Sequence, residues 1–312
     1  MLLILAKRLL WAVPSAILIT ALLFFSVAGL LGSPAALMLG QDATAQSIAE
    51  LNARLGFDRP LLTQYLEWMG KALHGDLGRS YSTHQTVADI ILPSLPVTLE
   101  LGILAIAFAS LVAVVIDSVT VGRRMIRPVA TALAMVGITL PNFALGSSLV
   151  FLFSVKLGWF PSFGWAPWSD GLLNHLYHIQ LPLLTLSAYY YGSFTLIYRA
   201  EYDAVSERLF VKVAMAKGLG EMAISFRHVL PNAILPVITY LGLSLGQLMG
   251  GAVVTESLFS IPGIGSLLVN SILSRDYPVM LAIGMITIVA VVLMNALADA
   301  LYAFANPQIR LE

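Results

Sequence analysis

Six long apolar stretches run through the sequence, and Asp, Glu, Lys and Arg occur only near their ends. A helix that crosses the ~30 Å hydrocarbon core of a bilayer needs about 20 such residues. The stretches span residues 9–31, 97–119, 128–155, 179–198, 233–254 and 277–298. The pattern predicts an all-α polytopic membrane protein with six transmembrane helices.

The distribution of basic residues predicts the orientation of these spans. An even number of spans puts both termini on one side, and the loops that carry most Lys and Arg face the cytoplasm. The basic residues on the terminal side are Lys7, Arg8, Arg123, Arg124, Arg127, Arg199, Arg208, Lys212, Lys217, Arg227 and Arg310. The short loops of the opposite side contain Lys156 and Arg275. Both termini are therefore predicted to be cytoplasmic.

The whole chain, 1–312, is predicted to form a single transmembrane permease domain. The apolar core of residues 9–31 is longer than the 7 to 15 residues of a secretory signal, so we interpret it as a retained anchor. Residues 32–96 form a mixed-polarity outer loop, and the core helices occupy 97–304.

The longest cytoplasmic segment, 199–231, is predicted to form a bent pair of helices. Apolar residues recur at helical spacing from Asp203 to Lys217, which favours one helix there. Gly218 and Gly220 interrupt that helix, and a second short helix follows from Glu221 to Leu230.

The composition supports a membrane protein and excludes other classes. Hydrophobic residues make up 58% of the chain and charged residues only 11%, whereas about 25% is typical of soluble domains. Soluble enzymes, disordered chains and nucleic-acid binders are excluded on this basis. The formal net charge is zero, and the lack of cysteine excludes disulfides and thiolate metal sites.

The chain shows no catalytic or metal-binding motif. A phosphate-binding loop needs several glycines followed by Lys and Ser or Thr, and the closest stretch, 216–221, has Lys before Gly. His175 and His178 fall in an outer loop, where interfacial histidines are favoured over a metal site. Ser148 and His228 could in principle serve an intramembrane serine protease, but helix packing is the favoured interpretation.

Ionisable and polar groups inside apolar stretches are candidates for function. Four carboxylates lie near span ends, where we expect them to reach water. They are Glu100, Asp117, Glu256 and Asp299. Glu256 is the best functional candidate among them. Pro141 and Asn142 fall within the third stretch, where a plain kink and a residue lining a pathway are equally favoured.

A stripe of small residues marks the fifth stretch. Gly242, Gly246 and Gly250 recur at every fourth position, which lets another helix backbone approach closely. The neighbour could belong to the same chain or to a second subunit.

The cytoplasmic segment resembles a signature of ABC importer permeases, which reads E-A-A, three residues, G, nine residues, I-x-L-P. Leu230-Pro231 follows Gly218 at the correct separation, and Ala214 also matches. Lys212, Val213 and His228 depart from the signature. Because Lys212 cannot accept the hydrogen bonds of a carboxylate, one contact of the family is in doubt.

Other blocks resemble the dipeptide/oligopeptide/nickel branch of these permeases along nearly the whole chain. They include residues 55–61, 75–80, 98–101, 141–143, 157–161, 228–239, 250–256, 262–265, 275–278 and 299–303.

The resemblance implies a type I importer permease in the bacterial inner membrane. Its partners would be a second, homologous permease, two cytoplasmic ATPase subunits, an extracytoplasmic substrate-binding protein and membrane lipid, with no nucleic acid. The chain itself would hold no cofactor, because ATP and Mg²⁺ would bind the ATPase subunits. The residues that would couple it to the ATPases are Phe210, Val211, Ala214, Lys217, Gly218 and Leu219.

The function that the sequence favours is ATP-driven import of di- or oligopeptides, with this chain forming the path and catalysing no reaction. The same machinery could instead import nickel or a metal chelate. The alternative from another class is a self-sufficient secondary transporter or channel.

Overall fold

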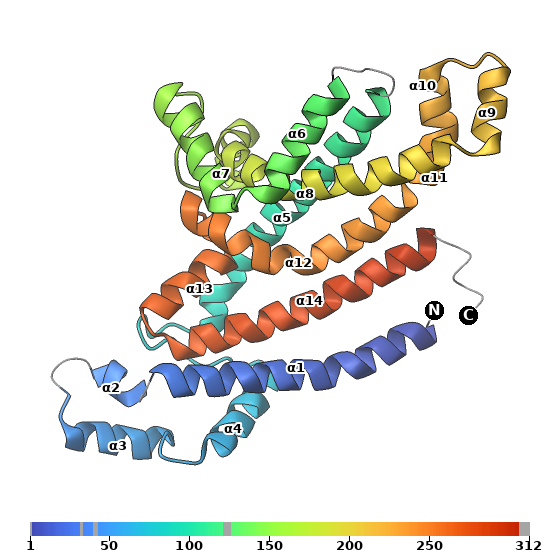
Figure 1. The fold of residues 1–312 in the computed structure, drawn as a ribbon. Helices are drawn as coiled ribbons and strands as arrows, with labels where there is room; N and C mark the ends of the chain where they lie inside the picture. Colours follow the sequence, from blue (N-terminus) through green and yellow to red (C-terminus); the bar gives the residue numbers. More distant parts are fainter. Residues whose placement is uncertain (1, 32–33, 40–42, 121–125, 306–312) are drawn as a thin grey trace. The chain divides into compact units, whose positions relative to one another are not determined.

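The computed structural model describes residues 2–31, 34–39, 43–120 and 126–305. These residues form helices joined by short connections, and the one β pairing among them is an isolated bridge between Arg79 and Thr86 (Figure 1). The all-α prediction is confirmed for this part of the chain. Three basic residues used to predict the orientation, Arg123, Arg124 and Arg310, lie outside the described residues.

Two compact units make up the chain, and each combines segments that are distant in sequence. Unit I comprises Thr98–Ile261 and Leu293–Glu312, and unit II comprises Leu2–Val97 and Pro262–Val292. A single domain over 1–312 remains a prediction.

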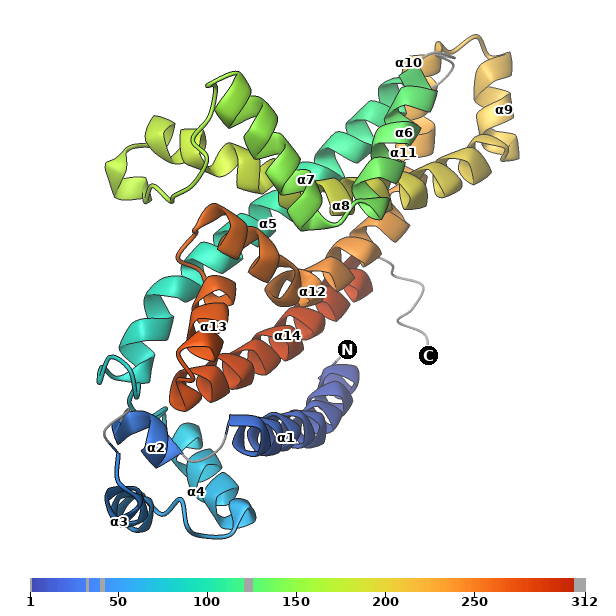
Figure 2. The same ribbon diagram turned by 60° about the vertical axis from the view of Figure 1, so that its left-hand side comes forward.

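Unit II contains the chain's first helices and a later segment. Its elements are α1 (Leu2–Leu31), α2 (Pro34–Leu39), α3 (Ala45–Leu55), α4 (Leu61–Leu73), the start of α5 (Val87–Val119), α13 (Ile264–Leu273) and the start of α14 (Tyr277–Ala305). Its core contains Phe24 and Val27 of α1, Tyr65 of α4 and Tyr277 of α14. Figure 2 shows α2, α3 and α4 gathered near the C-terminal end of α1.

Unit I is built around the long helix α8. Its elements are the rest of α5, α6 (Ile126–Thr139), α7 (Asn142–Leu149), a π-helical turn (Val150–Lys156), a 3₁₀ turn (Trp168–Asp170), α8 (Leu172–Ser206), α9 (Leu209–Ala216), α10 (Glu221–Ile224), a second π-helical turn (Ser225–Val229), α11 (Leu230–Ala233), α12 (Leu235–Phe259) and the end of α14. Helix α8 packs against α6 and α12 and buries Phe194 and Tyr198 completely.

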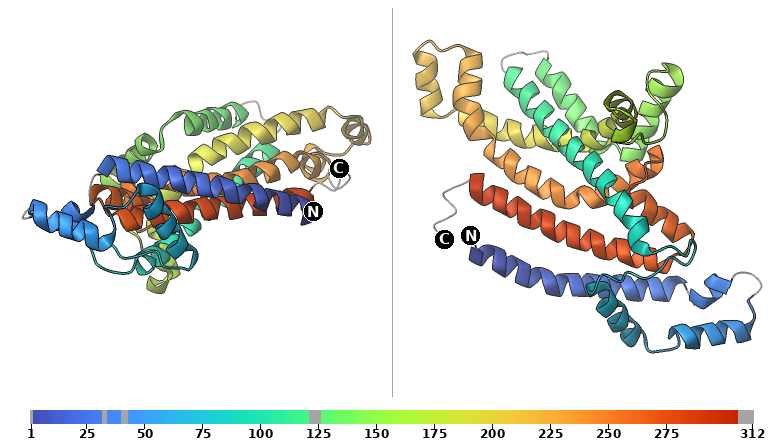
Figure 3. Two further views of the ribbon diagram at one scale, coloured as in Figure 1. Left: turned by 90° about the horizontal axis from the view of Figure 1, so that it is seen from below. Right: turned by 180° about the vertical axis from the view of Figure 1, so that it is seen from behind.

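Glycines bring α6 and α8 into backbone contact. A Cβ atom at Gly137 would lie 2.2 Å from the Ala188 carbonyl oxygen, and one at Gly192 would lie 2.4 Å from that of Ala134. Any larger residue would therefore force the two helices apart. Figure 3 shows α6 and α8 running side by side.

Some of the predicted spans match long apolar helices. Val87–Val119 and Tyr277–Ala298 are each long and apolar enough to cross a membrane, and the number reaches five if three pairs of helices separated by short breaks each count as one span. The six-span count and the cytoplasmic termini stay predictions.

The prediction of one continuous helix over 128–155 is wrong. Helix α6 ends at Thr139, α7 begins at Asn142, and the two segments are bent by 117°. Pro141 precedes α7 with an extended ψ of 138°. Because proline lacks an N–H and disfavours a helical residue before it, α6 ends before Pro141. The break exceeds the kink considered from the sequence.

Candidate functional site: an exposed elbow and buried polar groups

A bent elbow of two helices projects from unit I, formed by α9, α10 and the turn between them (Figure 1). The two limbs were predicted, but the predicted start of the first helix at Asp203 is wrong. Helix α8 continues to Ser206, and α9 begins only at Leu209. Arg208 takes an extended backbone conformation (ψ 149°), which separates the two helices.

Gly218 ends the first limb of the elbow. Its φ of +79° lies in the left-handed region that favours glycine. The Gly218 N–H donates to the Met215 carbonyl oxygen (2.9 Å), and the Leu219 N–H donates to that of Ala214 (3.3 Å). This pair of hydrogen bonds is the Schellman pattern, in which a left-handed glycine satisfies the last carbonyl groups of a helix. The glycine therefore fixes the direction in which the second limb leaves.

The two faces of α9 differ in burial. Val211 and Ala214 point inward and are buried, with Val211 0% exposed. Leu209 is 77% exposed, and the other exposed apolar residues of the elbow are Phe210, Val213, Met215, Leu219 and Met222. Of the predicted coupling residues, Phe210, Lys217, Gly218 and Leu219 thus lie on the surface. An apolar cluster of this kind is typical of a protein contact site.

Hydrogen bonds tie the second limb of the elbow to α5 and α8. The Ser225 hydroxyl donates to the Ser118 carbonyl oxygen over 3.0 Å, and both groups are buried. The Ser118 and Tyr198 hydroxyls lie 2.6 Å apart. A displacement of the elbow would therefore act on the end of α5 and, through Tyr198, on α8.

A buried ion pair links α5 and α8 nearby. The Arg199 guanidinium contacts the Asp117 carboxylate at 2.5 and 2.6 Å and donates a further hydrogen bond to the Thr131 hydroxyl of α6. The Asp117 side chain is only 4% exposed. The expectation that Asp117 reaches water is wrong, because Arg199 compensates its charge inside the unit.

Glu256 is also buried, contrary to expectation. Its side chain is 0% exposed, and Oε1 accepts a hydrogen bond of 2.6 Å from the Thr98 hydroxyl. The contact joins α12 to α5 within unit I. Glu256 thus links two helices of unit I, and a functional role for it stays a prediction. The Asp299 side chain lies outside the described residues.

Glu100 and His175 form a third pair, in which His175 is buried and Glu100 is half-buried. The His175 Nε2 lies 2.9 Å from the Glu100 Oε1, and its Nδ1 lies 2.7 Å from the Ala166 carbonyl oxygen. Trp168 stacks on the imidazole with ring centroids 4.0 Å apart. The placement of His175 in an outer loop is wrong, because it lies in the first turn of α8 and is buried. No group of residues suited to hold a metal ion occurs in the described part of the chain.

Two further candidates lie apart from these pairs. Asn142 is half-buried at the start of α7, and its place in a pathway stays a prediction. Ser148 is exposed and donates to the Ala144 carbonyl oxygen (2.8 Å), and within the described residues no hydrogen bond joins it to His228.

The members of the glycine stripe have different surroundings. A Cβ at Gly242 would lie 2.6 Å from the Ala298 Cβ, and one at Gly246 would lie 2.4 Å from the Asn295 Oδ1. Both neighbours belong to α14 of the same chain. A Cβ at Gly250 would meet none of the described atoms within 4 Å. The first two glycines therefore mark an intramolecular contact.

Comparison with known proteins covers nearly the whole chain. Residues 105–311 match the family described as binding-protein-dependent transport system inner membrane component, and residues 1–102 match the N-terminal model of the same membrane components. A putative peptide transport system permease protein of Brucella abortus is 35% identical over 306 residues, covering 97% of this chain and 98% of its own. The glutathione transport system permease protein GsiC of Escherichia coli K12 is 37% identical over 308 residues, covering 97% of each chain.

Proposed function

We propose that this chain forms the translocation path of an ATP-driven importer for peptides. The chain belongs to the family of inner membrane components of binding-protein-dependent transport systems. Peptide and glutathione permeases among its relatives support a peptide substrate. The proposed partners are a second permease, two ATPase subunits and an extracytoplasmic binding protein. The proposed topology is six spans in the type I importer fold, with both termini in the cytoplasm.

The exposed apolar surface of the elbow is the main structural support for this function. The elbow exposes this surface at one end of unit I, and its two limbs are anchored by buried contacts at Val211 and Ser225. A surface of this kind suits a partner that pushes on the permease, because the buried anchors pass displacement to α5 and α8. ATP and Mg²⁺ would then bind the partner, and this chain would move passively.

Cysteine substitution can locate the contact, because the native chain contains no cysteine. In the assembled transporter, Leu209→Cys and Met215→Cys should be shielded from a maleimide reagent when the ATPase subunits are present and react when they are stripped. Leu273→Cys is a matched control, because Leu273 is equally exposed (78%) but lies on α13. Equal reaction of the elbow cysteines with and without the ATPase subunits would contradict the docking assignment.

The substrate class requires a separate test. The assembled transporter, with its binding protein, should take up a radiolabelled di- or tripeptide into vesicles that contain ATP. An excess of unlabelled peptide should abolish the signal, and nickel or a nickel chelate should leave it unchanged. Uptake of nickel without uptake of peptide would assign the same machinery to a metal.

A further inference from the structure

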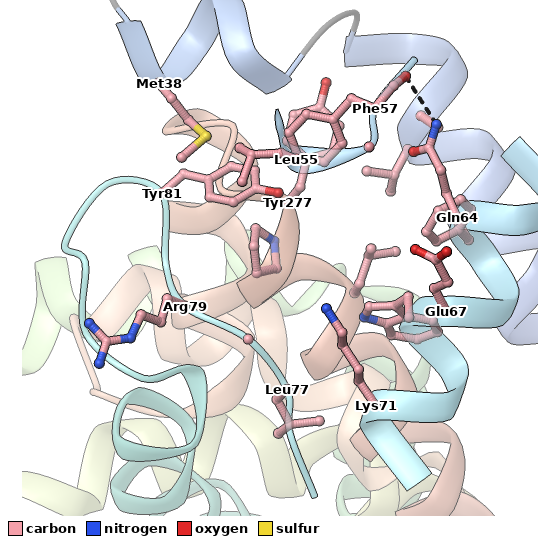
Figure 4. A pocket seen from close by; sticks show the side chains of 18 of the residues that line it. Met38, Leu55, Phe57, Gln64, Glu67, Lys71, Leu77, Arg79, Tyr81 and Tyr277 are labelled. Atoms are coloured by element: carbon pink, nitrogen blue, oxygen red, sulfur yellow. Dashed lines mark hydrogen bonds between the residues drawn. The ribbon is translucent and has the colours of Figure 1, made fainter. Parts of the chain in front are cut away.

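Unit II contains a cavity of about 680 Å³. Its walls come from the last third of α1, from α4, from the loop at 76–84 and from the start of α14 (Figure 4). All of these segments belong to the same unit. The volume lies in the range of cavities that hold organic ligands, roughly 300–1,000 Å³.

The walls of the cavity are mainly apolar. Phe24 and Val27 of α1 lie on one side, Trp68 of α4 and Leu281 of α14 on others. Helix α1 has 30 residues and is therefore about 45 Å long, more than the ~30 Å hydrocarbon core. The cavity lies at its C-terminal third, where a spanning helix of this length reaches the lipid headgroups. Next to the cavity residues, α1 exposes Leu22 and Phe25.

Hydrogen-bond donors without partners occur in the cavity. The Trp68 Nε1 is buried and has no hydrogen-bond partner among the described residues. Lys71 follows one helical turn later on α4, and it makes no salt bridge with any of the described residues. Figure 4 shows its ammonium group directed into the space between α4 and the loop at 77–81. Burial, together with the nearby Asp276 carboxylate, raises the pKa of the Tyr81 phenol, so its hydroxyl stays protonated and able to donate at neutral pH.

Two carboxylates that line the cavity have partners of their own. The Glu67 carboxylate forms a salt bridge with Arg59 (2.6 Å), and Asp76 accepts a hydrogen bond from the Gly78 N–H (2.9 Å). The Arg79 guanidinium points away from the other labelled side chains in Figure 4. Lys71 and Arg79 both line the cavity, but only Lys71 directs its charge into it. Trp68 and Tyr81 add neutral donors above an apolar interior.

We propose that this cavity binds an anionic phospholipid, with the phosphate near Lys71 and Trp68 and an acyl chain along Phe24 and Val27. The indole N–H and the ammonium group complement a phosphodiester, which supplies acceptors only. A zwitterionic peptide would also need a carboxylate for its ammonium group, and Arg59 already neutralises the Glu67 carboxylate. The apolar surface of α1 continues from the cavity towards the acyl chains, which gives the lipid a route of entry.

Photocrosslinking in the assembled transporter tests this site. The transporter is reconstituted into vesicles that contain a trace of phosphatidylglycerol with a diazirine on one acyl chain, or the same label on phosphatidylcholine. After irradiation, mass spectrometry should map the phosphatidylglycerol adduct to α1 and α4, with phosphatidylcholine giving a much weaker adduct there. Lys71→Gln should lower the phosphatidylglycerol adduct about fivefold, as expected for loss of one partly solvated charge-assisted contact.

Two variants make the result specific. Arg79→Gln removes a nearby cation whose guanidinium points elsewhere, and it should leave the adduct unchanged. Trp68→Phe keeps an aromatic side chain but removes the indole N–H, and it should lower the adduct without changing assembly of the complex. Equal labelling by the two lipids, equal effects of Lys71→Gln and Arg79→Gln, or labelling of the cavity by a diazirine peptide in place of the lipid would each overturn the proposal.

Discussion

A methyl group at Gly218 would meet no described atom within 4 Å, yet we expect it to disturb the elbow through the backbone alone. At a φ of +79°, a residue with a Cβ costs about 1–2 kcal/mol relative to glycine. A factor of ten in an equilibrium corresponds to about 1.4 kcal/mol, so Gly218→Ala should raise local opening of the turn about five- to thirtyfold.

Hydrogen exchange measures this opening directly. The amides of Gly218 and Leu219, which make the two capping hydrogen bonds, should exchange faster by that factor, while amides in the middle of α8 keep their protection. ATP-driven uptake should fall in parallel, because the second limb would leave α9 in several directions and dock poorly.

A graded series separates backbone strain from other effects. Gly218→Asn should be milder, because asparagine tolerates the left-handed region better than alanine. Gly218→Pro should be more severe, because its φ is fixed near −65° and it lacks the donor N–H. Gly220→Ala is the matched control, since Gly220 has a φ of −70° and equally open surroundings. Exchange and uptake in Gly218→Ala equal to those of the native protein, or an equal loss of uptake in Gly220→Ala, would contradict a role for backbone strain at Gly218.

Three further substitutions test the buried contacts. Arg199→Met should destabilise the detergent-solubilised protein by about 3–5 kcal/mol, because it leaves the Asp117 charge buried without a partner. A second change, Asp117→Leu, should restore most of the lost stability. A denaturation curve for Arg199→Met like that of the native protein would contradict a stabilising role for the ion pair. Gly246→Leu should lower thermal stability by about 1–3 kcal/mol, whereas Gly250→Leu should not, and the opposite order would refute the packing assignment. Asp276→Asn should weaken the hydrogen bonds that hold the loop at 80–82 and increase protease cleavage there, and unchanged cleavage would count against an anchoring role.

The sequence predicted the long helices α1, α5, α8 and α14 and the two limbs of the elbow, because long apolar runs and helical spacing are local signals. It did not predict α2, α3, α4 or α13. The predicted spans give the observed C-terminal end of α5 at Val119 and the observed start of α14 at Tyr277. The sequence also separated the two limbs of the elbow at Gly218, since only glycine readily takes the required conformation.

Contacts between distant segments were not predictable in the same way. Asp117 and Arg199 each lie near the end of an apolar stretch, and nothing local indicates that they pair. The close approach of α6 and α8 at Gly137 and Gly192 was also missed, because these glycines do not recur at every fourth position of one helix as Gly242 and Gly246 do. A search for single glycines within neighbouring spans could have found them.

The break at Pro141 shows a different limit. Hydropathy sums the residues on both sides of the proline and so indicates one span, whereas the chain bends by 117° there. Proline in an apolar stretch is compatible with a kink or a complete break, and tertiary packing decides between them.

In the proposed function, this chain is a passive path moved by ATPase subunits that bind its elbow. This role is tested most directly by measuring peptide uptake into vesicles that contain this chain and its partner permease, with binding protein and ATP, before and after adding the ATPase subunits. We expect uptake only after they are added, and loss of that uptake when ATP is omitted. Uptake that an ion gradient drives without the ATPase subunits would contradict it.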